Sequence, residues 1–235
     1  MVSAPWRTSL SVPLAQLFNQ SIHSCVVPCQ WKSAFITLIP KTAHPAEPSD
    51  FRPISITSVL SRSFERHVVR TYIYSALQQP PPDLSFSDQF AFKPTGSTTA
   101  ALISLLHSIS TMLTEWPYVH VIALDFSKAF DTVRHISLLQ KMARLYIPDE
   151  AYNRIRDFFD GHSHCTKFGA ETSSFANIMA SVIQGSSLGP ASFIVTAADL
   201  RPLQPGNVII KFADDTYLVI PASNTDSSLN ELKHI

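Results

Sequence analysis

The stretch "KFADDTYLVI", residues 211–220, places two acidic residues between two apolar runs. Asp214 and Asp215 separate the run 208–210 from the β-branched and aromatic run 217–220, a pattern that predicts a tight hairpin with both carboxylates near its tip. Adjacent carboxylates repel each other unless a cation neutralises their charge. The hairpin therefore predicts a cation-binding end of a sheet.

A third carboxylate follows a second predicted strand. The stretch "VHVIALDF", residues 119–126, has the pattern of a buried strand that ends in Asp125, and the helical pattern after it has Asp131 at its expected N-cap. If the two strands are neighbours, Asp125 meets Asp214 and Asp215, with the carboxyl groups of Asp125 and Asp214 about 3 to 6 Å apart. Such oxygen ligands suit Mg²⁺, whose remaining ligands often include substrate phosphates, so the pattern favours phosphoryl transfer.

The rest of the chain alternates helical and extended patterns, which predicts an α+β fold with helices packed on one face of a small antiparallel sheet. Helices are expected at 58–77, 98–113, 150–160 and 188–200, a strand at 34–40, and a hairpin from 164–170 and 177–183. The helix at 98–113 is expected to bury Leu102, Leu105, Leu106, Ile109 and Met112.

Composition narrows the class of protein. With 235 residues and 45% hydrophobic content, the chain can bury a substantial core. Its 18 basic and 18 acidic side chains balance, which argues against strong nucleic-acid binding by this chain alone. Three cysteines form neither a disulfide framework nor a zinc site, and no apolar run is long enough for a membrane span. We expect a reduced, soluble, intracellular protein without membrane partners.

Each acidic motif alone also has an ordinary structural explanation. An aspartate at a strand end is usually a turn former or a helix cap, and an Asp-Asp pair in a turn is often a solvated loop. A phosphohydrolase of another fold would normally have an Asp-x-Asp or His-Asp cluster, which "DFSKAFD", residues 125–131, does not contain. Neither motif establishes catalysis without the residues around it.

The surrounding motifs supply that context through their order. The chain contains, from its N-terminal side, "WKSAFITLIPK" (31–41), "DFRPISITSVLSRSFER" (50–66), "DQFAFKPTGSTTAAL" (88–102), "ALDFSKAFDTVRH" (123–135), "VIQGSSLGP" (182–190) and "FADD" (212–215). Together they resemble the reverse transcriptases of non-LTR (LINE-type) retrotransposons over about residues 30–222. Several motifs in a fixed order are far more specific than any one of them.

The resemblance implies a right-hand polymerase fold and an RNA-directed DNA polymerase. Residues 1–29 would be an N-terminal helical extension, 30–115 the fingers and 116–235 the palm, with the sequence ending before the thumb. The reaction would join a deoxynucleotide to a primer 3′-hydroxyl with the help of two metal ions. Expected partners are an RNA template, a DNA primer and deoxynucleoside triphosphates, with a thumb or flanking domains needed for tight binding. The resemblance also implies the cytoplasm and nucleus as locations.

The metal ligands implied by the resemblance are the three aspartates. Asp125 and Asp214 would be the principal ligands and Asp215 the third carboxylate, with the backbone carbonyl of Phe126 completing the shell of one ion. The ions would be two Mg²⁺, with Mn²⁺ as an alternative.

The nucleotide-binding residues implied by the resemblance are Phe130, Gln184, Gly185, Lys41 and Arg52. Phe130 would lie under the incoming sugar, where its ring leaves no room for a 2′-hydroxyl. Gln184 and Gly185 would pack near the incoming nucleotide, since glycine permits close backbone approach. Lys41 and Arg52 would grip the triphosphate.

The template-contacting loop departs from the family pattern. Lys93 matches a position that commonly holds Arg in the family, so it keeps the charge but loses the bidentate fork. Thr95 and Gly96 replace the usual Gly-Arg before Ser-Thr, which removes one expected cation. A noncatalytic remnant that retains the fold, and at most binds RNA or a protein partner, is therefore the alternative to an active polymerase.

Overall fold

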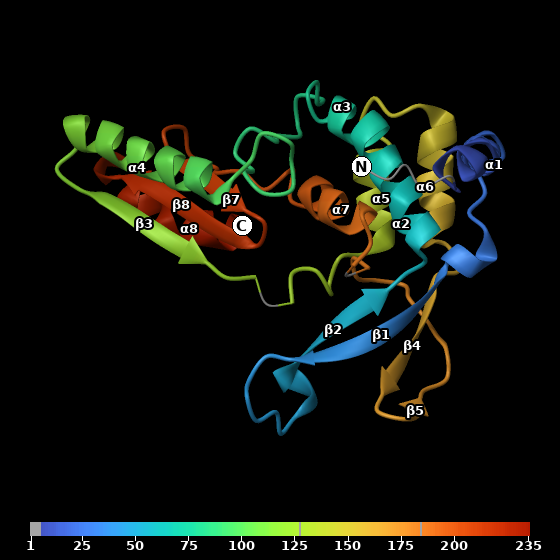
Figure 1. Ribbon diagram of the computed structural model, residues 1–235. Coiled ribbons are helices and arrows are strands. Elements are labelled where there is room, and N and C mark those ends of the chain that lie inside the picture. Colours follow the sequence, from blue (N-terminus) through green and yellow to red (C-terminus); the bar gives the residue numbers. More distant parts are fainter. Residues whose placement is uncertain (1–5, 127, 184) are drawn as a thin grey trace.

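The computed structural model describes residues 6–126, 128–183 and 185–235, and it shows helices combined with two small sheets (Figure 1). The α-helices are α1 (Trp6–His23), α2 (Val59–Val68), α3 (Tyr74–Ala76), α4 (Thr98–Glu115), α5 (His135–Met142), α6 (Asp149–Phe159), α7 (Leu188–Thr196) and α8 (Ser228–His234). No helix in these described ranges is long and apolar enough to cross a membrane. The predicted mixture of helices and strands is confirmed, but the described residues form two sheets, one of them with a parallel pair, where a single small antiparallel sheet was expected.

The acidic hairpin belongs to a three-stranded antiparallel sheet. Its strands are β3 (Val119–Leu124), β7 (Val208–Phe212) and β8 (Asp215–Pro221), in the order β3-β8-β7. Helix α4 lies across one face of this sheet and contacts all three strands (Figure 1). The strand that ends before Asp125 and the strand that begins at Asp215 are therefore neighbours, which meets the condition set for convergence of the acidic residues.

Helix α4 buries a narrower stripe than the sequence predicts. Leu105 is buried, and Ile109 and Met112 pack beside it against β7 and β8. Leu102 and Leu106 are instead 57% and 61% exposed. They lie one position further round the helix, about 100° from the stripe that contacts the sheet, so the helix turns them away from that contact.

The second sheet has five strands and contains a parallel pair. Its strands are β1 (Ser33–Pro40), β2 (Phe51–Ile56), β4 (Ser163–Phe168), β5 (Glu171–Thr172) and β6 (Ala176–Asn177). The expected hairpin is short, because β4 pairs with β6 only at Ser163↔Asn177 and His164↔Ala176. Beyond β6, the backbone N–H groups of Ser181 and Val182 donate to carbonyls at Val133 and Phe130, so the chain leaves the sheet.

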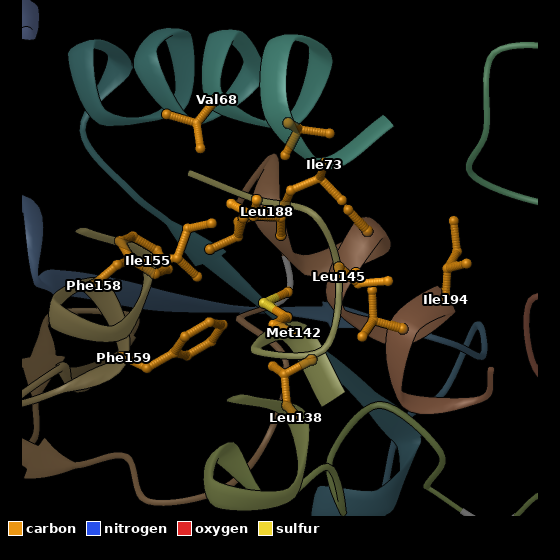
Figure 2. Close-up of a cluster of buried hydrophobic side chains, with 14 of the residues drawn as sticks. Val68, Ile73, Leu138, Met142, Leu145, Ile155, Phe158, Phe159, Leu188 and Ile194 are labelled. Atoms are coloured by element: carbon orange, nitrogen blue, oxygen red, sulfur yellow. The ribbon is translucent and has the colours of Figure 1, made fainter. Parts of the chain in front are cut away.

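The main hydrophobic core lies between the helices α2, α5, α6 and α7 (Figure 2). Leu138 and Met142 of α5, Ile155 of α6 and Leu188 of α7 are all essentially inaccessible to solvent. Burial of each such side chain contributes about 1.5 to 3 kcal/mol, so this cluster is a principal source of stability. The predicted helix at 58–77 is confirmed as α2 and α3 joined by a π-helical turn over Val69–Ile73.

The expected N-cap at Asp131 is wrong. Helix α5 begins at His135 with Arg134 in the cap position. Asp131 lies in the turn before it, where Lys128 has a positive φ of 55° and its carbonyl accepts from the N–H groups of Asp131 and Thr132. Because residues 128–132 form this turn, helix α5 does not begin at Asp131.

His162, at the junction of α6 and β4, is buried in its neutral form. Its side chain is inaccessible to solvent, its Nδ1 lies 3.3 Å from the carbonyl oxygen of Phe158, and its Nε2 has no partner among the described residues. Burial is the main cause that lowers the pKa of His162 from 6.5 to about 4, with His135, His164 and Lys32 acting in the same direction.

Acid is therefore expected to destabilise the fold through His162. Between pH 6.5 and about 4 the unfolded chain binds a proton at this residue that the folded chain does not, so stability falls as pH falls. The full loss is about 3 kcal/mol. Urea unfolding of wild type and His162→Leu across this window measures it, with the exposed His234→Gln as control. If the free energy of unfolding of His162→Leu falls with pH as steeply as that of wild type, His162 is not the group that causes the loss.

Candidate active site

The acidic hairpin turns through two residues, Ala213 and Asp214. Phe212 and Asp215 close the loop as the last pair of β7 and β8, and Ala213 has a positive φ of 57°. Two-residue hairpin loops with positive φ at the first position favour glycine there. An alanine in this conformation carries strain of about 1 to 2 kcal/mol, so other contacts must hold the turn.

Register places the third aspartate at the same end of the sheet. Leu124, the last residue of β3, pairs with Thr216 of β8. Asp125 directly follows Leu124 and Asp215 directly precedes Thr216, so the two acidic residues come at neighbouring strand ends. Asp125 and Asp215 are exposed and Asp214 is half-buried, which leaves all three accessible to a ligand.

The donor set fits Mg²⁺ in chemistry, although the side chains are not yet gathered. Within the described residues, no group of three or more His, Cys, Asp or Glu side chains is close enough to hold a metal ion. Two uncompensated carboxylates 4 Å apart repel by about 4 kcal/mol at an effective dielectric constant of 20. Convergence of Asp125, Asp214 and Asp215 therefore requires a cation, and their expected separation stays a prediction. The Phe126 carbonyl accepts from the Ala129 N–H at 3.2 Å and has a second lone pair free for a cation.

A hollow of about 280 Å³ lies beside the turn. Its walls come from the segment after β3, from α7 with the residues after it, and from the hairpin, and they consist of Phe126, Ala129, Thr132, Phe193, Thr196, Ala197, Asp199, Leu200, Ala213 and Thr216. The three aspartates are not among these lining residues, although Phe126, Ala213 and Thr216 are their direct neighbours in sequence. Asp215 instead lines another hollow, between α4 and the strands β7 and β8.

Phe130 and Gly185, both predicted to contact the nucleotide, line a second hollow of about 290 Å³. The ring of Phe130 stacks on Phe193 with centroids 4.4 Å apart and meets the edge of Phe92 at 6.2 Å. Phe130 is therefore both part of the core and a fixed wall of a cavity. Gln184, predicted beside Gly185, lies outside the described residues.

Gly185 cannot be replaced without moving a neighbouring strand. Its φ is +106°, and a Cβ atom there would lie 2.3 Å from the backbone carbonyl oxygen of Ser55 in β2. The loop before α7 therefore packs directly on the five-stranded sheet at this point.

The substitution Gly185→Ala is expected to destabilise the fold by about 1 to 3 kcal/mol more than Gly169→Ala. Gly169 also has a positive φ, +61°, but an added Cβ would meet nothing within 4 Å. The pair therefore separates the steric clash from the shared backbone strain, and chemical denaturation measures both. Equal losses in the two variants would show that the loop does not press on β2.

Lys41 and Arg52 lie at one end of the β1–β2 hairpin. Arg52 pairs with Ile39, and Lys41 directly follows the last residue of β1. Both side chains are exposed, and the Lys41 Nζ donates to the carbonyl oxygen of Ser49 at 2.8 Å. The structure brings these two cations together, while the hydrogen bonds and ion pairs of the described residues do not join either one to Asp125.

Lys93, the predicted template contact, is folded back on its own loop. Its Nζ donates to the carbonyl oxygen of Phe86 at 2.8 Å and lies 5.6 Å from the ring centroid of Phe90. Burial is the main cause that lowers the pKa of Lys93. The template role of Lys93 stays a prediction.

The sequence interpretation missed a buried ion pair behind the hairpin. Lys211 of β7 is 1% exposed, and its Nζ lies 3.0 Å from an Asp88 carboxylate oxygen. The same ammonium donates to the carbonyl oxygens of Ala197 and Leu200, at 2.9 and 3.0 Å, so all three of its donors are used. Burial lowers the pKa of Lys211, and Asp88 opposes that shift. The sequence feature that could have indicated this ion pair is the lysine within the otherwise apolar run 208–212.

The chain is similar in sequence to known proteins. Residues 39–235 match the family described as reverse transcriptase (RNA-dependent DNA polymerase). The chain is 30% identical over 205 residues to the "Probable RNA-directed DNA polymerase from transposon X-element" of Drosophila melanogaster, a match that covers 85% of this chain and 22% of the relative. It is also 30% identical over 212 residues to the "RNA-directed DNA polymerase from mobile element jockey" of the same species, covering 86% of this chain and 23% of that protein. The chain thus spans between a fifth and a quarter of these curated relatives.

Two solved telomerase structures are similar to this fold. Apo telomerase from Candida tropicalis, truncated from its C-terminal domain, aligns with a TM-score of 0.63 at 15% identity, covering 89% of this chain and 47% of that one. Telomerase from the same organism in complex with a fragment of telomeric RNA gives 0.63 at 13% identity, covering 96% and 41%. The fold and the family match agree, and the chain belongs to the reverse transcriptase (RNA-dependent DNA polymerase) family, in the group of non-LTR retrotransposon enzymes.

Proposed function

We propose that this chain is the part of a retrotransposon RNA-directed DNA polymerase that joins deoxynucleotides to a primer 3′-hydroxyl. The proposal rests on the strand register, because Asp125, Asp214 and Asp215 occupy backbone positions at the same end of the adjacent strands β3 and β8, next to residues that line an open hollow. Family membership then favours polymerisation over other phosphoryl transfer.

The three aspartates would hold two Mg²⁺ ions, or Mn²⁺ in their place, together with the Phe126 carbonyl. Bound at this position, the ions would lower the pKa of the primer hydroxyl and stabilise negative charge on the reacting phosphate. The protein's own contribution is to hold carboxylates at fixed strand ends, so that nucleotide phosphates complete the ligand set.

Residues around the second hollow would select and orient the nucleotide. The ring of Phe130, held by Phe193, would form the floor under the sugar and exclude a 2′-hydroxyl. Gly185 would allow close approach of the nucleotide, with Gln184 beside it. Lys41 and Arg52 would reach the triphosphate from the end of the β1–β2 hairpin, which needs that hairpin to close toward the aspartates.

Residues 1–29 would form an N-terminal helical extension, 30–115 the fingers and 116–235 the palm. The RNA template is supported by the telomerase of the same fold that is solved with telomeric RNA. Lys93 would contact this template after release from the Phe86 carbonyl. A DNA primer and deoxynucleoside triphosphates complete the set of partners, and we propose the cytoplasm and nucleus as locations.

A noncatalytic remnant that at most binds RNA or a protein partner is the second candidate. One observation favours it, namely that the Lys93 ammonium is engaged within its own loop. The balanced charge of the chain also predicts weak hold on nucleic acid without other domains.

Primer extension on an RNA template with Mg²⁺ separates the two candidates. The assay compares this chain, a version extended at its C-terminus with the following sequence of its retroelement, and Asp214→Asn in each. Extension by either wild-type form, abolished by Asp214→Asn, supports the polymerase. No product from either form would favour the remnant.

A further inference from the structure

We propose that Gln89 is a positioning residue that fixes the acidic turn and thereby the direction of Asp214. The amide oxygen of its side chain accepts a hydrogen bond from the Ala213 N–H at 3.0 Å, across 124 positions of sequence. The effect of Gln89 on catalysis rests on the proposed polymerase function, whereas its effect on the turn does not.

The Gln89 side chain is buried and oriented without ambiguity. It is 1% exposed, and its oxygen also accepts from the Ala91 N–H at 2.9 Å. Both partners are backbone donors, so the oxygen rather than the nitrogen must face them. The Gln89 Nε2 has no partner among the described residues, so within them the Gln89 amide acts as a hydrogen-bond acceptor and not as a donor.

The backbone around Gln89 is tied to β7 and so holds the side chain in place. The Lys211 N–H donates to the Asp88 carbonyl at 2.8 Å, and the Phe90 N–H donates to the Lys211 carbonyl at 2.8 Å. Gln89 and Lys211 thereby form a parallel bridge, and residues 88–90 extend the edge of the three-stranded sheet. The ion pair between Lys211 and Asp88 adds a side-chain contact between the same two segments.

The turn needs an external acceptor because of its conformation. Ala213 combines a positive φ of 57° with a side chain that is only 8% exposed. In the two-residue loop, the paired strands end at Phe212 and Asp215, so the Ala213 N–H lies outside the ladder. Without Gln89 this buried donor would be unpaired, and the strained turn would relax into other conformations. Because Asp214 is the next residue, each of those conformations would point its carboxylate elsewhere.

Hydrogen exchange of backbone amides tests the contact directly. The variants are Gln89→Met, which keeps the size but has no oxygen acceptor, and Gln89→Glu, which keeps the acceptor. By NMR of the full chain, we expect the Ala213 amide to exchange about 10-fold or more faster in Gln89→Met and to recover in Gln89→Glu. The amides of Leu203 and Gln204, which donate to Glu231, are the internal control and should not change.

A general loss of stability gives a different result. The matched control variant is Asn207→Ala, which removes another buried side-chain contact, the donor to Glu231, far from the turn. It should leave the Ala213 amide unchanged. The proposal is overturned if Ala213 exchanges within twofold of wild type in Gln89→Met, or if all amides of that variant accelerate equally.

The effect of Gln89 on catalysis is measured with whichever form extends a primer, either the chain itself or its C-terminally extended version. There, Gln89→Met should lower kcat about 10-fold or more with little change in KM for the nucleotide, and Gln89→Glu should restore part of it. An unchanged kcat alongside faster Ala213 exchange would overturn the positioning role. Absence of activity in the wild-type forms would contradict the proposed function, and the exchange experiment would then decide the role of Gln89 in the turn.

Discussion

Replacing Lys211 with Met is expected to destabilise the chain by about 3 to 5 kcal/mol. The substitution leaves the Asp88 carboxylate, whose side chain is 14% exposed, without its cation, and it leaves the carbonyls of Ala197 and Leu200 without their donor. The substitution should also loosen the contact between β7 and the C-terminal end of α7, because the Lys211 ammonium donates hydrogen bonds to two carbonyls there. Chemical denaturation with a two-state fit measures the change.

The matched control is Arg144→Met, which breaks the ion pair with Asp83. Those side chains are 49% and 38% exposed, so solvent screens them and the expected loss is under about 1 kcal/mol. The double variant Lys211→Met with Asp88→Leu should be more stable than Lys211→Met alone, because the unpaired buried charge is gone. A loss below about 1 kcal/mol in Lys211→Met would show that the ion pair is hydrated in solution.

The substitution Asp125→Asn is expected to lower kcat for primer extension by about 10²- to 10³-fold or more. Asparagine keeps the size of the side chain but removes the charge that would hold the metal at the end of β3. The effect should therefore include a higher Mg²⁺ requirement, measured as the ion concentration at half-maximal rate.

The exposed residue Asp226 provides the control for Asp125. Asp226→Asn removes the same charge from a residue near the C-terminal end of β8, at the opposite end from the acidic turn, and should leave both the rate and the Mg²⁺ requirement unchanged. An Asp125→Asn variant that retains wild-type kcat and the same Mg²⁺ requirement would exclude Asp125 as a metal ligand.

Local patterns predicted the parts of the fold that depend on neighbours in sequence. The alternation on either side of Asp214 predicted the hairpin, and the apolar run before Asp125 predicted β3. The helix α4 was predicted as well, because its residues repeat at helical spacing. Its buried face was wrong at Leu102 and Leu106, since sequence spacing does not tell which part of a broad apolar stripe will meet the sheet.

The features that could not be predicted join residues far apart in the chain. The bond from Ala213 to Gln89 and the pair of Lys211 with Asp88 span more than 120 positions, and no local pattern encodes such a partner. The Asp131 cap failed for a different, local reason, because the Lys128 carbonyl accepts from the N–H groups of Asp131 and Thr132 and forms a turn before the helix. The stretch "DQFAF", residues 88–92, matches a motif of the reverse transcriptase family. That match does not indicate that Gln89 contacts the acidic turn.

Asp125 and Asp214 are proposed to share one metal ion during nucleotide transfer. The most direct test is a structure of the polymerase with RNA template, primer, a nonhydrolysable deoxynucleotide and Mg²⁺. We expect carboxylate oxygens of both residues about 2.0 to 2.1 Å from one ion that also contacts the nucleotide phosphates. Carboxylates on separate faces of the sheet, or an ion held by only one of them, would contradict this account of the site.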